Sequence, residues 1–247
     1  MPTTTHFGFR DVESHEKAKL VGEVFSSVAS KYDVMNDVMS AGMHRLWKRH
    51  FVGIANIRAG DKILDLAGGT GDIAKLMAER TGDTGHVVLS DINQAMLSVG
   101  RDRMLNEAAF GRISCAQINA EALPFAARQF DLVTIAFGLR NVTDKAKALA
   151  EMHRVLKIGG KLMVLEFSEL RINALKPLYD AYSFKILPRM GKLIANDSAS
   201  YQYLAESIRK HPNQEALAEM MRGVGFARVT VQNLFGGMVA IHTGYSV

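Results

Sequence analysis

The chain has 247 residues, of which 48% are apolar and 22% are charged, and its formal net charge is +5. This length suits one well-buried α/β domain and is short for two, while the composition excludes a disordered or fibrous protein. The positive charge is compatible with nucleic acid and with an anionic membrane surface, so charge alone excludes neither partner.

The single cysteine, Cys115, leaves no internal disulfide and suits a reducing compartment. The first residues lack the basic and apolar segments of a secretory signal, and no apolar run approaches the roughly 20 residues that span a bilayer. We therefore expect a cytoplasmic protein, with transient contact at the inner face of a membrane as a further expectation.

Residues 14–54 show apolar side chains at three- and four-residue spacing, which predicts a helical cap over about residues 1–58. The densest basic cluster, His44 to His50, lies in this cap. Its pattern is typical of an amphipathic helix with a solvated face, and a patch resting on lipid headgroups is the alternative. On such a helix, Leu46, Trp47, His50 and Phe51 share one face, and Arg45, Lys48 and Arg49 spread around the other.

Beyond the cap, predicted strands alternate with predicted helices. Helical periodicity indicates helices at 71–80, 93–108 and 144–156. Such alternation is typical of βαβ units, which form a parallel sheet with helices on both faces. The apolar runs that predict strands are 61–67, 86–91, 112–118, 130–137 and 160–167.

The alternation stops near Leu170. Residues from about 170 to 212 are apolar, rich in aromatic residues and predicted to be helical, so we expect an inserted lid that carries the substrate. Residues 225–247 form two β-rich runs around two glycines, which predicts a hairpin. The expected fold is a single α/β domain over 1–247 of the class I methyltransferase type, Rossmann-like, with a mostly parallel seven-stranded sheet and a C-terminal antiparallel hairpin.

A glycine-rich turn follows the first strand of this sheet, in the sequence ILDLAGGTGDIA at 63–74. Glycines let a ligand approach the backbone closely, and the amides that begin the next helix face that ligand. In a dinucleotide these amides would hold the pyrophosphate. In S-adenosylmethionine they and Thr70 would meet the amino-acid end, and Asp65 would suit its ammonium group. The glycines are Gly68, Gly69 and Gly71.

Asp91 ends the second strand, about 20 residues further on, where a carboxylate accepts hydrogen bonds from ribose hydroxyls in either ligand class. The segment NAEALPF at 119–125 follows the third strand, where methyltransferases place a polar residue against adenine. Together with the terminal hairpin, this segment favours S-adenosylmethionine and methyl transfer over a nicotinamide cofactor.

Several longer segments make the chain resemble the C-methyltransferase family of ubiquinone and menaquinone biosynthesis, nearly from end to end. Among them, VASKYDVMND and FGLRNVTD are more specific than the glycine turn. The other matching segments are FGFRDV, NAEALPF, LYDAYSFKILPRMG and SYQYLAESIRKHPNQ.

The resemblance implies methylation of a ring carbon on a prenylated quinol, either demethylmenaquinol or 2-polyprenyl-6-methoxy-1,4-benzoquinol, with S-adenosylmethionine as donor. Ala136 stands where relatives often have a serine that contacts the cofactor. We expect no nucleic-acid partner, and a homo-oligomer or a complex of quinone biosynthesis is compatible with the resemblance. The family's cofactor contacts match Thr70, Asp91, Asn119 and Ala120.

Arg140 and Asn141 follow the fourth strand and are the candidate catalytic residues. The arginine would stabilise a quinolate oxygen, and the asparagine would orient the hydroxyl or a water. Asp33 is the candidate general base, with Tyr182 and His211 as alternatives that more often serve in packing or capping. No cluster with metal-ligand spacing appears in the sequence, and methyl transfer from a sulfonium requires no metal.

Four other functions remain open at this point. A dehydrogenase could use the same glycine turn, although the hairpin and NAEALPF oppose it. A nucleic-acid methyltransferase would show an N-P-P-Y-like run or a catalytic cysteine, and neither is present. Methylation of another small phenol or a sterol, and a non-catalytic scaffold that binds the cofactor, are the remaining alternatives.

Overall fold

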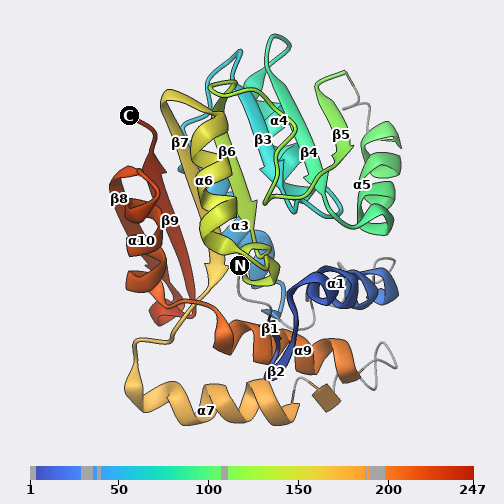
Figure 1. Ribbon diagram of the computed structural model, residues 1–247, viewed down its shortest axis with the longest axis vertical. Coiled ribbons are helices and arrows are strands. Elements are labelled where there is room, and N and C mark those ends of the chain that lie inside the picture. The colour runs from blue at the N-terminus through green and yellow to red at the C-terminus, as the bar shows by residue number, and fades with distance from the viewer. Residues whose placement is uncertain (1–3, 29–35, 38–39, 107–110, 187, 190–197) are drawn as a thin grey trace.

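The computed structural model describes residues 4–28, 36–37, 40–106, 111–186, 188–189 and 198–247. Its centre is a seven-stranded sheet in the order β5-β4-β3-β6-β7-β9-β8 (Figure 1). Neighbouring strands from β5 to β7 pair in parallel, and β9 is antiparallel to both β7 and β8. The strands are β3 (Lys62–Leu66), β4 (His86–Asp91), β5 (Ile113–Gln117), β6 (Phe130–Ala136), β7 (Leu156–Phe167), β8 (Ala227–Leu234) and β9 (Val239–Tyr245).

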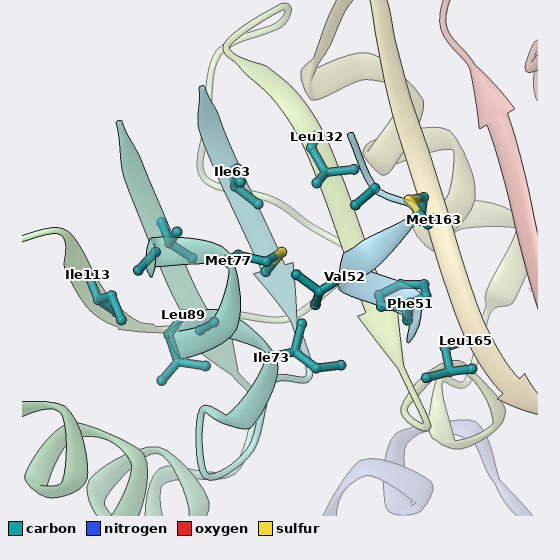
Figure 2. Close-up of a cluster of buried hydrophobic side chains, with 14 of the residues drawn as sticks. Phe51, Val52, Ile63, Ile73, Met77, Leu89, Ile113, Leu132, Met163 and Leu165 are labelled. Carbon is teal, nitrogen blue, oxygen red and sulfur yellow. The ribbon is translucent and has the colours of Figure 1, made fainter. Parts of the chain in front are cut away.

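This sheet confirms the predicted fold class, including the C-terminal antiparallel hairpin. Helices α3 (Met43–Gly53), α4 (Asp72–Thr81) and α5 (Gln94–Asn106) supply one core, which contains Phe51, Met77 and Met104 and is drawn in Figure 2. Helices α6 (Lys145–Val155) and α10 (Gln214–Gly223) supply a second core against strand residues of the opposite face. Strands covered on both faces are apolar almost throughout, which is why the predicted runs were continuous rather than alternating.

The strand order reverses at β3 and β6. These strands are neighbours in the sheet, although β4 and β5 lie between them in the sequence. Connections leave these two strands toward opposite sides, so a crevice forms at their carboxyl ends, where open α/β sheets bind ligands. The cap covers this end of the sheet (Figure 1). Other elements at or near this end come from later in the chain. The remaining elements are β1 (Thr4–Phe7), β2 (Arg10–Glu13) and α1 (Ser14–Val28) of the cap, and η2 (Leu139–Asn141), η3 (Asn173–Leu175), α7 (Lys176–Ala181), η4 (Tyr182–Ile186), α9 (Ser198–Lys210) and η5 (Phe235–Gly237).

The prediction of a wholly helical N-terminal cap was wrong at its start, because β1 and β2 form an antiparallel pair before α1. Gly8, with φ of 59°, makes the turn between them. Phe7 stacks on Tyr203 of α9 at a centroid distance of 4.2 Å. This tertiary contact anchors strands of four residues each, which are too short for a periodic signal.

The predicted faces of the basic helix were also wrong in part. Helix α3 buries His44, Trp47 and Phe51, while Leu46 and His50 are exposed. The helix is oriented by Trp47, whose ring packs near Phe137, Phe167 and Phe235. These aromatic contacts fix which side chains of the helix are buried.

Two elements differ from the prediction in their bounds or existence. Strand β7 begins at Leu156 instead of residue 160, and α10 forms where we predicted no helix. The ring of His153 in α6 is half-buried and lies edge-on to Phe226 of the chain segment after α10, at 4.9 Å. Within the described part of the chain, no helix is long and apolar enough to cross a membrane.

Candidate cofactor and acceptor site

Two adjoining cavities lie where β3 and β6 end, with volumes of about 420 and 110 Å³. The larger lies within the size range of small-molecule sites. They share Ala67, Gly69 and Phe137, whose φ angles are 50°, 56° and 55°. A left-handed backbone is costly for alanine and phenylalanine, and such strain collects at functional sites. The chain therefore holds both strand ends in a conformation that opens the crevice.

The glycine turn forms the floor of the larger cavity, which Gly68, Gly69 and Thr70 line. Gly71, with φ of 84°, is the N-cap of α4 and needs the freedom of glycine. A Cβ on Gly68 would lie 2.4 Å from Leu89 Cδ1 and 2.8 Å from Asp65 Oδ2. Gly68 is thus required by close packing.

Asp65 lies at the end of β3, is almost fully buried and lines the larger cavity. Its Oδ1 accepts a hydrogen bond from Thr134 Oγ1 at 2.7 Å, whereas its Oδ2 has no partner within the described residues. Burial raises the pKa of Asp65 to about 7, against the smaller opposing effect of Thr134. A buried carboxylate oxygen without a partner is suited to a cationic ligand group.

Asp91 and its neighbours form the smaller cavity. Asp91 Oδ2 accepts from the Gly69 amide at 3.0 Å, and its Oδ1 accepts from the Asn93 amide at 2.8 Å. These bonds join the end of β4 to the glycine turn and fix the carboxylate. Burial raises the pKa of Asp91, and the two amides oppose that shift. Each oxygen keeps a lone pair for a hydroxyl donor.

Asn119 and Ala120 line the same small cavity. Asn119 Oδ1 already accepts from the Glu121 amide at 2.9 Å, so this side chain also shapes the turn. Helix α1 closes the cavity from the cap with Val21 and Phe25. Asn93 ties that helix down, since its Nδ2 donates to Gly22 O at 2.9 Å and to Ser26 Oγ at 3.0 Å.

Aromatic side chains form much of the lining of the larger cavity. They come from five separate parts of the chain: the basic helix, two strand ends, the insertion and η5. Ala136 lines this cavity as well, at the position where we expected relatives to carry a serine. The aromatic residues are Trp47, Phe137, Phe167, Tyr179, Tyr182 and Phe235.

Arg140 lines the larger cavity and is buried. Its Nη1 donates to Glu166 Oε1 at 2.9 Å and to the Phe137 carbonyl, and its backbone amide donates to Glu166 Oε2 at 3.2 Å. Its Nε has no partner within the described residues. Arg140 is therefore held by a structural ion pair and still reaches the cavity.

The other predicted catalytic residues do not all lie beside Arg140 in the larger cavity. Asn141 lines the smaller cavity, and its Oδ1 accepts from the Tyr203 hydroxyl at 3.0 Å. Asp33 lies outside the described residues, so its prediction is not tested. Tyr182 lines the larger cavity, whereas His211 is buried and lines neither cavity. Within the described chain, no group of three or more His, Cys, Asp or Glu residues could hold a metal ion.

Comparison with known proteins assigns the chain to a family. The model of the ubiE/COQ5 methyltransferase family matches residues 11–246. The chain belongs to this family. A relative from Xanthomonas oryzae pv. oryzae, named ubiquinone/menaquinone biosynthesis C-methyltransferase UbiE, is 64% identical over 99% of this chain and 96% of its own length. A relative of the same name from Stenotrophomonas maltophilia is 63% identical with the same coverage.

Solved structures show the class I methyltransferase fold for this member of the ubiE/COQ5 family. A possible histamine N-methyltransferase from Thermotoga maritima aligns with a TM-score of 0.65 at 18% identity, over 91% of this chain and 99% of that one. A Haemonchus contortus phosphoethanolamine N-methyltransferase solved with S-adenosyl-L-methionine aligns with a TM-score of 0.54 at 22% identity, over 74% and 36%.

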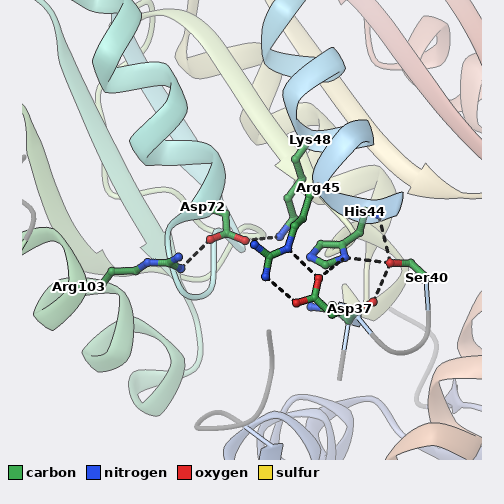
Figure 3. A network of polar contacts seen from close by, with 8 residues as sticks. Asp37, Ser40, His44, Arg45, Lys48, Asp72 and Arg103 are labelled. Carbon is green, nitrogen blue, oxygen red and sulfur yellow. Dashed lines mark hydrogen bonds and ion pairs between the residues drawn. The ribbon is translucent and has the colours of Figure 1, made fainter. Parts of the chain in front are cut away.

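A charged network at the rim of the site was missed from the sequence (Figure 3). Asp72, the first residue of α4, accepts from Lys48 Nζ at 2.7 Å and from Arg103 Nη1 at 2.6 Å. Lys48 and Asp72 both line the larger cavity. Lys48 comes from the basic cluster that we assigned to solvent or lipid. No local sequence pattern indicates this network, because Lys48 lies 24 positions from Asp72 and Arg103 lies 31 positions from it.

The close packing of the glycine turn can be tested by substituting Gly68. Gly68→Ala should lower the free energy of unfolding by about 1–3 kcal/mol and displace Asp65, because the added methyl overlaps Leu89. Chemical denaturation measures the change. The matched control is Gly223→Ala, since nothing lies within 4 Å of a Cβ there. Equal stability of both variants would contradict the close fit.

Proposed function

We propose that this chain transfers the methyl group of S-adenosylmethionine to a ring carbon of a prenylated quinol. The observation that supports the proposal most is the lining of the larger cavity, which combines Asp65 and the glycine turn with aromatic side chains and Arg140. A cationic cofactor group and a flat, apolar acceptor would therefore lie next to each other. The names of the relatives support quinone biosynthesis as the setting.

The residues of the two cavities fit S-adenosylmethionine, whose sulfonium supplies an activated methyl group. Asp65 would receive its ammonium group through the unpartnered Oδ2, and Asp91 would accept from the ribose hydroxyls. Asn119 and Ala120 would border the adenine. Gly69, which the cavities share, would lie between the two halves of the cofactor.

Arg140 is our proposed catalytic residue. A phenol with a pKa near 10, as for tyrosine, is a weak carbon nucleophile until its proton is removed. The buried guanidinium would stabilise the quinolate oxygen and so raise electron density on the neighbouring ring carbon. Asn141 would act from the side of the smaller cavity, where Tyr203 orients it. Asp33 stays our candidate base, and a homo-oligomer or a quinone-biosynthesis complex stays a prediction.

The test is methyl transfer from radiolabelled S-adenosylmethionine to reduced benzoquinol and naphthoquinol acceptors that carry a short prenyl tail. We expect transfer to at least one of them, and the ratio of their kcat/KM values gives the acceptor preference. Cofactor binding by calorimetry is measured in parallel. Cofactor binding without transfer to either quinol would overturn the proposal and favour another small phenol or a scaffold.

A further inference from the structure

Exposed apolar side chains gather at the end of the molecule formed by α7. Among the described residues, fourteen large apolar side chains are exposed, and seven of them belong to this end. Single exposed apolar residues are ordinary, whereas a concentration of them marks an interaction surface. The seven, here called the α7 face, are Phe9, Ile172, Leu175, Leu178, Phe184, Ile186 and Phe235.

Contacts join elements of this face that are distant in the sequence. Phe9, in the turn between β1 and β2, stacks with Phe184 at a centroid distance of 6.1 Å. Ile172 packs against η5, where a Cβ on Gly236 would lie 2.8 Å from Ile172 Cδ1. Figure 1 shows α7 as the outermost helix at this end. The fold thus brings the N-terminal hairpin, the insertion and η5 to one side of the protein.

Cations accompany these apolar side chains. The sequence from 171 to 189 holds four basic residues and one acidic residue. Two of the basic residues are paired, Arg171 with Glu215 and Lys176 with Glu169, which leaves Lys185 and Arg189. Lys185 and Arg189 are exposed beside the apolar positions. Lys210 Nζ lies 5.9 Å from the Phe9 ring centre, and the Arg209 guanidinium lies 5.6 Å from that of Phe184. Exposed apolar side chains mixed with Lys and Arg are typical of surfaces that rest on anionic lipid.

The same segment also forms the wall of the larger cavity. Tyr179, Tyr182 and Ser183 line this cavity. Leu178, directly before Tyr179, and Phe184, directly after Ser183, are exposed. One short helical segment therefore separates the cavity from the α7 face. An acceptor whose tail dissolves in a bilayer would have the shortest path to the cavity from this side.

We propose that the α7 face rests on the surface of an anionic lipid bilayer and presents the larger cavity to acceptor dissolved there. The choice of a lipid partner rests on the proposed function, which supplies an acceptor with an apolar tail. The basic helix α3 is less suited, because Leu46 is its only exposed large apolar side chain among the described residues, whereas the α7 face has seven.

Flotation with lipid vesicles tests this surface. Wild type, Leu178→Glu, Ile158→Glu and Leu46→Glu are compared on vesicles of phosphatidylglycerol with phosphatidylethanolamine and on phosphatidylcholine alone. Ile158 is the matched control, since it is 65% exposed against 69% for Leu178 and lies near the start of β7, at the opposite end of the sheet. Leu46→Glu tests the basic helix.

We expect wild type to bind the anionic vesicles, with binding weakened by salt. Leu178→Glu should lower the partition coefficient about ten- to a hundredfold, because a leucine no longer enters the apolar layer. Both control variants should bind as wild type does. Absence of wild-type binding, equal binding by Leu178→Glu, or loss of binding in Leu46→Glu alone would each overturn the proposal.

A second measurement separates this proposal from the proposed function. Wild type and Leu178→Glu are assayed on a water-soluble short-tail quinol and on a long-tail quinol embedded in anionic vesicles. Equal rates on the soluble acceptor, with a slower variant on the embedded one, support the lipid surface. Inactivity of wild type on the soluble acceptor would contradict the proposed function, while the flotation result would still decide the surface.

Discussion

Arg140→Ala is expected to lower the free energy of unfolding by about 3–5 kcal/mol and to reduce methyl transfer at least about a hundredfold. The stability loss follows because Glu166 would keep a buried charge without its cation. The loss of transfer follows because the quinolate oxygen would lose its stabilising charge. Chemical denaturation and the radiolabel assay measure the two effects on the same preparation.

The double variant Arg140→Gln with Glu166→Gln separates these effects. It removes both charges of the buried pair and keeps one acceptor oxygen at position 166, whereas the Arg140 and Phe167 amides now donate to different oxygens of Glu166. We expect part of the stability to return, whereas transfer stays low and cofactor affinity stays near wild type. Recovery of transfer along with stability would show that Arg140 is only structural.

Asp65→Asn is expected to stabilise the cofactor-free protein above pH 7 by roughly 4 kcal/mol, because burial raises the pKa of Asp65 to about 7. Between the ordinary pKa and about 7, the folded protein keeps a proton that the unfolded chain has lost. Wild-type stability therefore falls as pH rises through this window, and the advantage of the variant vanishes below it. Denaturation series at several pH values measure the difference. A variant no more stable than wild type above pH 7 would contradict the raised pKa.

The same substitution should have the opposite effect on the cofactor. Loss of the carboxylate that would receive the ammonium group should weaken S-adenosylmethionine binding about ten- to a hundredfold above pH 7. Wild-type affinity should strengthen as pH rises toward that value, and the part of this trend that is due to Asp65 should be absent from the variant. Calorimetry measures both. Equal affinity in the two proteins would remove Asp65 from the cofactor site.

Local sequence was sufficient to predict which residues gather on the cofactor side of the site. The glycine turn, Asp91 and the Asn119–Ala120 pair each lie at or just beyond the end of a strand of the parallel sheet, and the carboxyl ends of such strands meet at one edge. Their convergence around two joined cavities could therefore be predicted without any knowledge of side-chain packing.

The acceptor side could not be predicted in this way. Glu166 lies near the end of an apolar run, and its role becomes visible only through its contact with Arg140, 26 residues away. Tyr203 reaches Asn141 from α9 across 62 residues. The orientation of α3 depends on Trp47 and its aromatic neighbours. These contacts are set by tertiary packing between residues far apart in the sequence, which periodicity does not report.

The most direct test of the central claim is the position of the transferred methyl. The chain is incubated with S-adenosylmethionine that carries a ¹³C-labelled methyl and with a reduced short-tail quinol, and the product is examined by carbon NMR. Our account predicts a methyl resonance of a ring-bound carbon, with the two phenolic oxygens unmodified. A methoxy resonance would identify an O-methyltransferase and contradict the account.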